Sequence, residues 1–190
     1  PLPAFTAPSH QAPADLEDAC RQIVAKLRGA HRPLIIAGTG VRLASAGSAL
    51  LAFAEAHGIP VATAWTHDLI ASDHPLFAGR PGTIGTRAGN FCAQNADCVI
   101  VIGSRLNIRQ VSYNWDSFAK DAVITQVDAD PAELAKPFVK PHLSVACDAR
   151  LFVEALTAAC ADGLAGCDDA ALWRWLADRE NRADLVGGIS

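Results

Sequence analysis

The segment CVIVIGSR, residues 98–105, decides the fold: five consecutive apolar residues end abruptly in glycine, serine and arginine. A second run of this kind, PLIIA at residues 33–37, ends in Gly38-Thr39-Gly40. Short unbroken apolar runs are typical of strands buried on both sides, as in a parallel sheet with helices on both faces. The two runs therefore predict central strands of a parallel sheet.

Helical and extended patterns alternate on either side of these runs. Helices are predicted at about 16–27, 45–57, 86–95 and 149–161. Further strands are predicted at about 59–63, 123–127 and 143–146. The Gly- and Pro-rich stretch between residues 64 and 85 is expected to be irregular. This alternation predicts an α/β fold with a doubly wound, mainly parallel sheet of the Rossmann-like kind and helices on both faces.

The two ends of the chain differ from its body. Residues 1–13 contain four prolines and are predicted to be a linker, whereas residues 14–165 form the predicted domain. Residues 166–190 are polar and charged, with an amphipathic helix at about 168–181 that leads toward a further domain. Because the chain contains no methionine, even at position 1, we expect it to be a piece of a longer protein.

The composition narrows the class of partner. A net charge of −4 and a pI near 5.8 disfavour nucleic acid and anionic membrane surfaces as partners. The apolar runs are strand-length, and no signal-peptide pattern opens the chain, so we expect a cytoplasmic protein. The six cysteines form no C-x-x-C pair and are predicted to be reduced structural thiols. No metal site is expected, because the acids and histidines at 67–74 lack ligand spacing.

The residues that follow the predicted strands are suited to binding a ligand. They are Gly38-Thr39-Gly40, Ala64-Trp65-Thr66, Gly103-Ser104-Arg105, Asp128-Ala129-Asp130 and Cys147-Asp148. Ligands of an open parallel sheet bind beyond the carboxyl ends of its strands. Glycines let backbone N–H groups approach phosphate, arginine binds phosphate through several donors, and carboxylates accept hydrogen bonds from ribose hydroxyls or an adenine amine. This mixture favours a nucleotide.

Simpler interpretations remain open for single motifs. An NAD-binding fingerprint fails because Leu43 occupies the position of its third glycine, and no P-loop sequence occurs. Taken alone, Gly38-x-Gly40 fits a tight strand-to-helix turn equally well. Arg105 and Arg109 also fit a solvated basic pair. Helix initiation explains Asp130 fully, which leaves Asp128 as the better ligand candidate.

Five segments in order carry a resemblance to a known family. They are RPLIIAGTGV at 32–41, GIPVATAW at 58–65, the long stretch from His74 to Arg109, QVDADPAEL at 126–134, and Asp148. Together they make residues from about Leu16 to Leu156 similar to the middle domain of thiamine-diphosphate-dependent enzymes of the acetolactate synthase group. The resemblance implies a Rossmann-like domain of the DHS-like NAD/FAD-binding type. Two departures are Thr83-Ile84, where the family has Met-His, and Asn107-Ile108, where it has paired aspartates.

The resemblance also implies cofactor-binding positions, since members of this family bind FAD in extended form along the strand ends, or bind ADP, or bind nothing in this domain. Gly38, Thr39 and Gly40 would then lie against the dinucleotide. The flavin side would be lined by Ala64, Trp65 and Thr66, with Gly82, Thr83, Ile84 and Gly85 close by. Phosphate and ribityl groups would be bound by Gly103, Arg105 and Arg109. Asp128 would bind the ribose, and Asp148 with Ala149 the adenine. The FAD of such an enzyme is largely structural.

The resemblance implies that the chemistry lies outside this chain. Thiamine diphosphate and Mg²⁺ are bound in this family by a G-D-G motif and a glutamate of the neighbouring domains, and the sequence contains no G-D-G. We therefore expect no catalytic residue here and an inactive chain. The intact protein is expected to be a homodimer or homotetramer that decarboxylates a 2-keto acid such as pyruvate and transfers the acyl carbanion to a carbonyl acceptor. Two alternatives are a decarboxylase or lyase without flavin and a stand-alone nucleotide-binding regulatory module.

Overall fold

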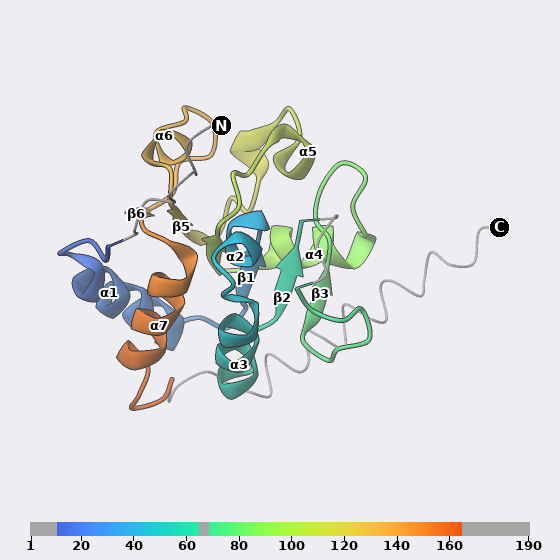
Figure 1. The fold of residues 1–190 in the computed structure, drawn as a ribbon. Helices are drawn as coiled ribbons and strands as arrows, with labels where there is room; N and C mark the ends of the chain where they lie inside the picture. The colour runs from blue at the N-terminus through green and yellow to red at the C-terminus, as the bar shows by residue number, and fades with distance from the viewer. Residues whose placement is uncertain (1–10, 65–68, 165–190) are drawn as a thin grey trace, which may run out of the picture.

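The computed structural model describes residues 11–64 and 69–164, which form one α/β layer structure (Figure 1). Its strands are β1 (Pro33–Ala37), β2 (Val61–Thr63), β3 (Phe77–Gly79), β4 (Cys98–Ile102), β5 (Val123–Asp128) and β6 (Leu143–Ala146). Its helices are α1 (Leu16–Arg28), α2 (Thr39–Leu43), α3 (Gly47–His57), α4 (Arg87–Asn95), α5 (Ile108–Val111), the 3-10 helix η1 (Trp115–Ser117), α6 (Pro131–Leu134) and α7 (Ala149–Ala159). The linker expected at 1–13 lies largely, and the helix expected at 168–181 entirely, outside the described residues.

All six described strands are parallel and lie in the order β3-β2-β1-β4-β5-β6. The chain builds the sheet outward from β1 in one direction and then returns to add β4 on the other side of β1. The order therefore reverses between β1 and β4, where connections leave toward opposite faces. This confirms the predicted doubly wound parallel sheet.

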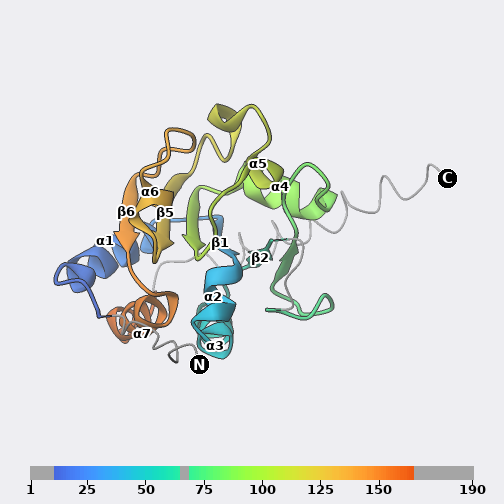
Figure 2. The same ribbon diagram turned by 45° about the horizontal axis from the view of Figure 1, so that its top comes forward.

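The two central strands show why unbroken apolar runs were required. Along β4, Ile100 and Ile102 point to one face of the sheet, and Val99 and Val101 point to the other. The first face is covered by α1, α3 and α7, and the second by α4, α5 and the segment around Phe118 (Figure 2). Because both faces are buried, no position of these strands can be polar without losing its hydration.

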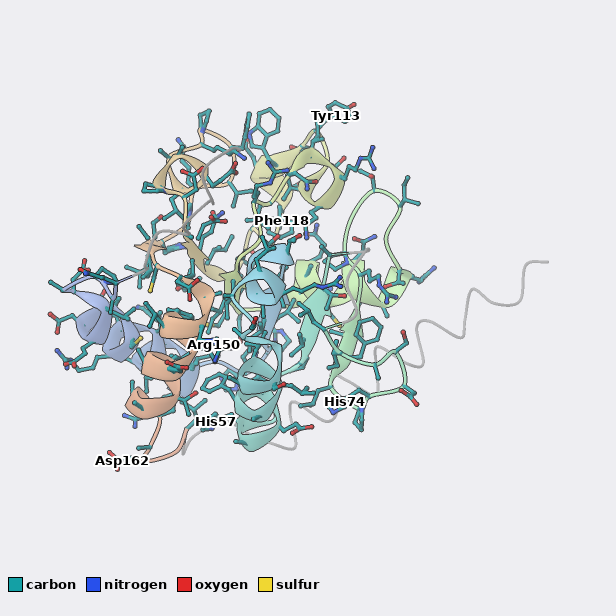
Figure 3. The ribbon with its side chains drawn as sticks, in the orientation of Figure 1. His57, His74, Tyr113, Phe118, Arg150 and Asp162 are labelled. Atoms are coloured by element: carbon teal, nitrogen blue, oxygen red, sulfur yellow. The ribbon has the colours of Figure 1, made fainter. Side chains whose placement is uncertain are left out.

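Side-chain periodicity positions the helices on these faces. In α1 the residues that face the sheet and α7 recur every three to four positions, and the last turn is basic with Gly29 after it. On the opposite face Phe118 is buried, whereas Tyr113 projects from the edge of the molecule beside α5 (Figure 3) and is 79% exposed.

Two elements differ from the sequence-based expectation. The stretch expected to be irregular contains β3, which adds a three-residue edge strand to β2 through Phe77 and Gly79. So short a strand has no period that a sequence pattern can reveal. The chain also turns directly from Gly38 into α2, before Ser45 adopts a positive φ of 53° and separates α2 from α3.

The described cysteines agree with the expected structural role. Cys20, Cys92, Cys98, Cys147 and Cys160 are buried free thiols. Among residues 11–64 and 69–164, no helix has the length and apolar character that a membrane crossing requires.

Candidate functional site

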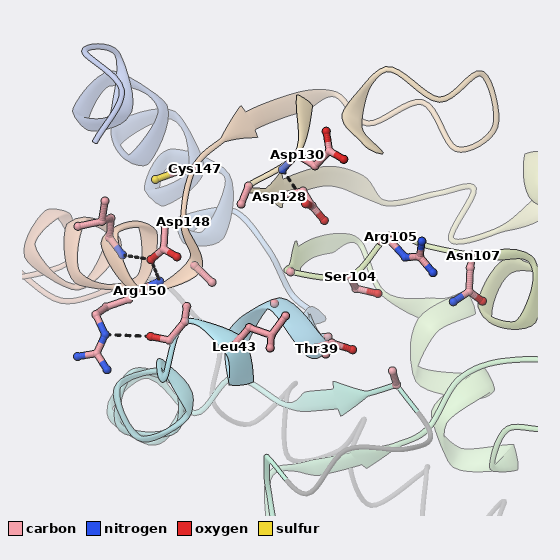
Figure 4. Close-up of a pocket in the computed structure, with 18 of the residues that line it drawn as sticks. Thr39, Leu43, Ser104, Arg105, Asn107, Asp128, Asp130, Cys147, Asp148 and Arg150 are labelled. Atoms are coloured by element: carbon pink, nitrogen blue, oxygen red, sulfur yellow. Dashed lines mark hydrogen bonds between the residues drawn. The ribbon is translucent and has the colours of Figure 1, made fainter. Parts of the chain in front are cut away.

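A groove of about 1010 Å³ runs across the carboxyl ends of the strands (Figure 4). It crosses the point where the strand order reverses, as expected for a ligand site in an open parallel sheet. Its lining residues are Gly38, Thr39, Gly40, Leu43, Ala44, Ala64, Gly103, Ser104, Arg105, Asn107, Gln110, Asp128, Ala129, Asp130, Cys147, Asp148, Ala149, Arg150 and Leu151.

The floor of the groove is made of backbone in close contact. Gly38 N–H donates to the Ile102 carbonyl at 2.9 Å, and Gly40 N–H donates to the Gly103 carbonyl at 2.9 Å. A Cβ on Gly40 would lie 2.6 Å from the Gly103 Cα, and one on Gly38 would lie 2.3 Å from the Gly103 carbonyl oxygen. Glycine is therefore required here by the close approach of two backbones.

One end of the groove, at β5 and β6, is acidic. The Asp128 Oδ1 accepts the Asp130 N–H at 3.0 Å, and Asp130 caps α6 by accepting the Ala132 N–H at 2.9 Å. Asp148 caps α7, since its Oδ1 accepts the N–H groups of the next helical turn. Burial raises the pKa of the Asp128 carboxyl above its usual range. A half-buried carboxylate at a strand end is a strong acceptor for ligand hydroxyls.

The two arginines at the groove have different surroundings. Arg150 donates to the Ala44 carbonyl at 3.0 Å and to the Ser45 carbonyl, which ties the start of α7 to the α2–α3 turn. The Arg105 Nη1 lies 3.6 Å from the Glu133 Oε1, and the Arg105 side chain is 63% exposed. The Arg105 guanidinium is solvated, and Glu133 has a second ion-pair partner in Lys136. Arg105 is therefore the cation that can turn toward an anionic ligand at small cost.

A buried polar group follows β4. Ser104 Oγ donates to the Gln110 Oε1 at 2.8 Å, and Gln126 Nε2 donates to the Ser104 carbonyl at 3.3 Å. The Gln110 Nε2 is buried and has no hydrogen-bond partner. Gln110 was not predicted from the sequence, because an isolated glutamine eight positions after the end of β4 follows no recognisable pattern.

The groove brings together eight of the positions expected from the sequence. They are Gly38, Thr39, Gly40, Ala64, Gly103, Arg105, Asp128 and Asp148, and Ala149 lines it as well. Trp65 and Thr66 lie outside the described residues.

The remaining described positions that were expected to bind the cofactor do not line the groove; they are Gly82, Thr83, Ile84, Gly85 and Arg109. Gly82 and Thr83 line a second hollow of about 250 Å³, which shares Gln110 with the groove. Thr83 N–H donates to the Arg109 carbonyl at 2.8 Å, so the loop 82–85 is attached to α5. Ile84 is 82% exposed at the tip of this loop, and Gly85 N–H donates to the Gly82 carbonyl at 3.0 Å. The structure thus joins Arg109 to the loop through its backbone.

Comparison with known proteins identifies the family. Residues 20–156 match the family described as "Thiamine pyrophosphate enzyme, central domain". The chain belongs to this family. The groove therefore lies in the central domain of a thiamine pyrophosphate enzyme. The cofactor of the enzymes in this family is thiamine diphosphate.

Individual relatives of this central domain are larger proteins. The probable acetolactate synthase large subunit of Methanococcus aeolicus is 36% identical over 135 residues, which cover 70% of this chain and 22% of the relative. The isozyme 2 large subunit of Escherichia coli acetolactate synthase is 35% identical over 145 residues, covering 75% of this chain and 25% of the relative. The sulfoacetaldehyde acetyltransferase of Rhodobacter capsulatus is 37% identical over 142 residues, covering 72% and 24%. The chain spans about a quarter of the length of these relatives or less.

Proposed function

We propose that this chain is the adenine-nucleotide-binding central domain of a thiamine-diphosphate-dependent 2-keto acid decarboxylase and carboligase of the acetolactate synthase type. The observation that carries the proposal is the groove, with a glycine backbone floor in its middle and carboxylates at its β5–β6 end. The exposed guanidinium of Arg105 beside these glycines suits phosphate, and the carboxylates suit ribose hydroxyls and an adenine amine. The proposed ligand is FAD or ADP.

The residues of the groove would hold such a ligand in one direction. Asp128 and Asp148 would accept hydrogen bonds from the adenosine part at the β5–β6 end. The diphosphate would lie over Gly38, Gly40 and Gly103, where an added side chain would collide with backbone. Arg105 would supply the positive charge that offsets the acidic end. The opposite direction is unfavourable, because it would put a diphosphate beside three aspartates: Asp128, Asp130 and Asp148.

The contribution of this domain to the reaction would be structural. When bound, FAD would stabilise the loops at the strand ends and would undergo no net oxidation or reduction, as the resemblance to the acetolactate synthase group implies. Thiamine diphosphate and Mg²⁺ would be bound by the domains that neighbour residues 14–165 in the intact protein, which we propose to be a homodimer or homotetramer. The 190-residue chain alone is expected to leave pyruvate unconsumed when both cofactors are added. Pyruvate turnover by the purified chain would contradict this division of labour.

Nucleotide binding is the direct test of the groove. Titration calorimetry of the purified chain with ADP and with FAD should show saturable binding of at least one of them. The variant Asp128→Asn, which removes the negative charge and preserves the shape, should weaken binding by about tenfold, the effect of one charged hydrogen bond. Asp121→Asn is the matched control, because Asp121 is exposed and does not line the groove. Equal affinities for the two variants, or no binding by the unaltered chain, would overturn the proposal.

The alternative of a lyase without flavin is distinguished in the intact protein. Flavin absorbance of the purified intact protein would favour the synthase type. A colourless protein whose central domain binds ADP in solution would favour the flavin-free alternative.

A further inference from the structure

The segment from Gly103 to Ser112, which follows β4 and includes α5, is held in one conformation. Gly103 adopts a positive φ of 58°, Leu106 one of 45° and Ser112 one of 63°, so the chain turns sharply at the start, middle and end of the segment. Leu106 and Val111 are buried in the core beneath it. Strained backbone of this kind persists only where the surrounding packing determines it. Gln110, which lies between these anchors, is 6% exposed, and they hold its backbone beside the groove.

The side-chain amide of Gln110 is oriented by its neighbours. Its Oε1 accepts the Ser104 hydroxyl at 2.8 Å, and the Ser104 carbonyl in turn accepts the Gln126 Nε2 at 3.3 Å. This hydrogen bond turns Oε1 toward Ser104 and leaves Nε2 at the other end of the amide. This nitrogen has two N–H donors and no partner. Buried amide donors are nearly always hydrogen-bonded, so an unpaired one beside a hollow indicates a partner that binds there.

The position of Gln110 along the groove indicates which part of a ligand it would meet. Ser104, its hydrogen-bond partner, is the residue that a Cβ on Gly38 would touch at 2.6 Å, so Gln110 adjoins the glycine floor. On its other side Gln110 lines the second hollow together with Gly82. It therefore lies on the side of the floor away from Asp128 and Asp148. A nucleotide with its adenosine at the acidic end would present its outer phosphate to this amide.

We propose that Gln110 is a specificity-determining residue of the groove, whose Nε2 donates a hydrogen bond to the second phosphoryl group of a bound adenosine diphosphate, either free ADP or the same unit within FAD. The proposal rests on the nucleotide-binding function proposed above. An adenosine monophosphate lacks the second phosphoryl group and would leave the amide unpaired. The groove would thus discriminate diphosphates from monophosphates through one neutral amide, in addition to any charge effect of Arg105.

The test compares ligands that differ by one phosphoryl group. Affinities of AMP, ADP and FAD are measured by titration calorimetry for the full chain, for Gln110→Met and for Gln22→Met. Methionine has a similar length and no donor, and Gln22 lies exposed on α1 as a matched control. Gln110→Met should weaken ADP and FAD binding by about tenfold, which is about 1.4 kcal/mol, and should change AMP binding by less than about twofold. Gln22→Met should leave all three affinities unchanged.

A second readout uses the unaltered chain and does not depend on the variant folding. The Gln110 side-chain amide signals in a ¹H–¹⁵N correlation spectrum, assigned from backbone-linked experiments, should shift on saturation with ADP and not with AMP. Unmoved signals, or a loss of AMP affinity equal to that of ADP, would overturn the role of Gln110 and leave the groove assignment standing. Failure of all three ligands to bind the unaltered chain would overturn the nucleotide-binding function, and the role of Gln110 with it.

Discussion

Replacing Gly103 by alanine tests whether the floor of the groove is set by backbone contact. Gly103 has a φ of +58°, and its Cβ would lie 2.6 Å from the Gly40 Cα and 2.7 Å from the Val41 N. Both of the contacted atoms belong to backbone, so no flexible side chain can move aside. The alanine must therefore separate β4 from the turn after β1, at the point where the strand order reverses.

The magnitude follows from two separate contributions. An alanine in the left-handed region costs roughly 1–2 kcal/mol, and forcing a methyl group into a packed site costs typically about 1–3 kcal/mol more. Gly103→Ala should therefore lower the free energy of unfolding by about 2–5 kcal/mol, a large part of the roughly 5–15 kcal/mol that stabilises most domains.

Gly163 provides a matched control. It has a φ of +77° and nothing within 4 Å of a built Cβ. Gly163→Ala should thus show only the free-energy cost of placing alanine in the left-handed backbone region. Alanine also lowers the entropy of the unfolded chain, but this effect is the same in both variants and cancels. Urea unfolding followed by circular dichroism should place the two variants about 1–3 kcal/mol apart. If Gly103→Ala is no less stable than Gly163→Ala, the floor is not a rigid backbone contact and the reasoning fails.

Three further predictions concern charge, thiols and capping. Burial raises the pKa of the Asp128 carboxyl in the folded chain, so the unaltered chain loses stability as pH rises from the unfolded pKa, about 4, through the folded one. Asp128→Asn does not titrate. In urea unfolding, its stability relative to the unaltered chain should therefore be greater at about pH 7 than at about pH 4. Burial raises the pKa of Cys20 and of Cys147 to about 11. In a Cys167→Ser chain, which keeps only the five buried thiols, a thiol reagent at pH 8 should therefore react only after urea is added. Fast labelling of the native chain would contradict this. Asp148→Ala should lower the free energy of unfolding by about 1 kcal/mol through loss of the α7 cap, and Asp148→Asn by less.

The central strands were predictable because their physics is local. Five consecutive apolar residues in β1 and in β4 are needed because both faces of these strands are buried. The ends of these strands then located the groove, since the carboxyl ends of parallel strands meet at one edge. By contrast β3 was missed, because three residues show no period, and its place beside β2 is set by a pairing between distant segments.

The candidate site divides in the same way. Glycines and aspartates directly after strands were found from sequence, since strand ends bring them together whatever the intervening loops do. Gln110 was not found, because its place at the groove depends on three positive φ values and a hydrogen bond to Ser104. Arg109 was expected to serve phosphate groups, and the structure adds a backbone role for it, as acceptor of the Thr83 N–H.

The groove contains residues that maintain the fold and residues for which we propose a role in ligand choice. Gly40 and Gly103 do the first, because their contact is part of the switch between β1 and β4 and cannot change without cost to the sheet. We propose the second role for Asp128 and Gln110, because both line the groove and each keeps hydrogen-bonding capacity beyond the bond that it already makes. A domain built in this way can change its ligand by substitutions at two side chains while its sheet is untouched.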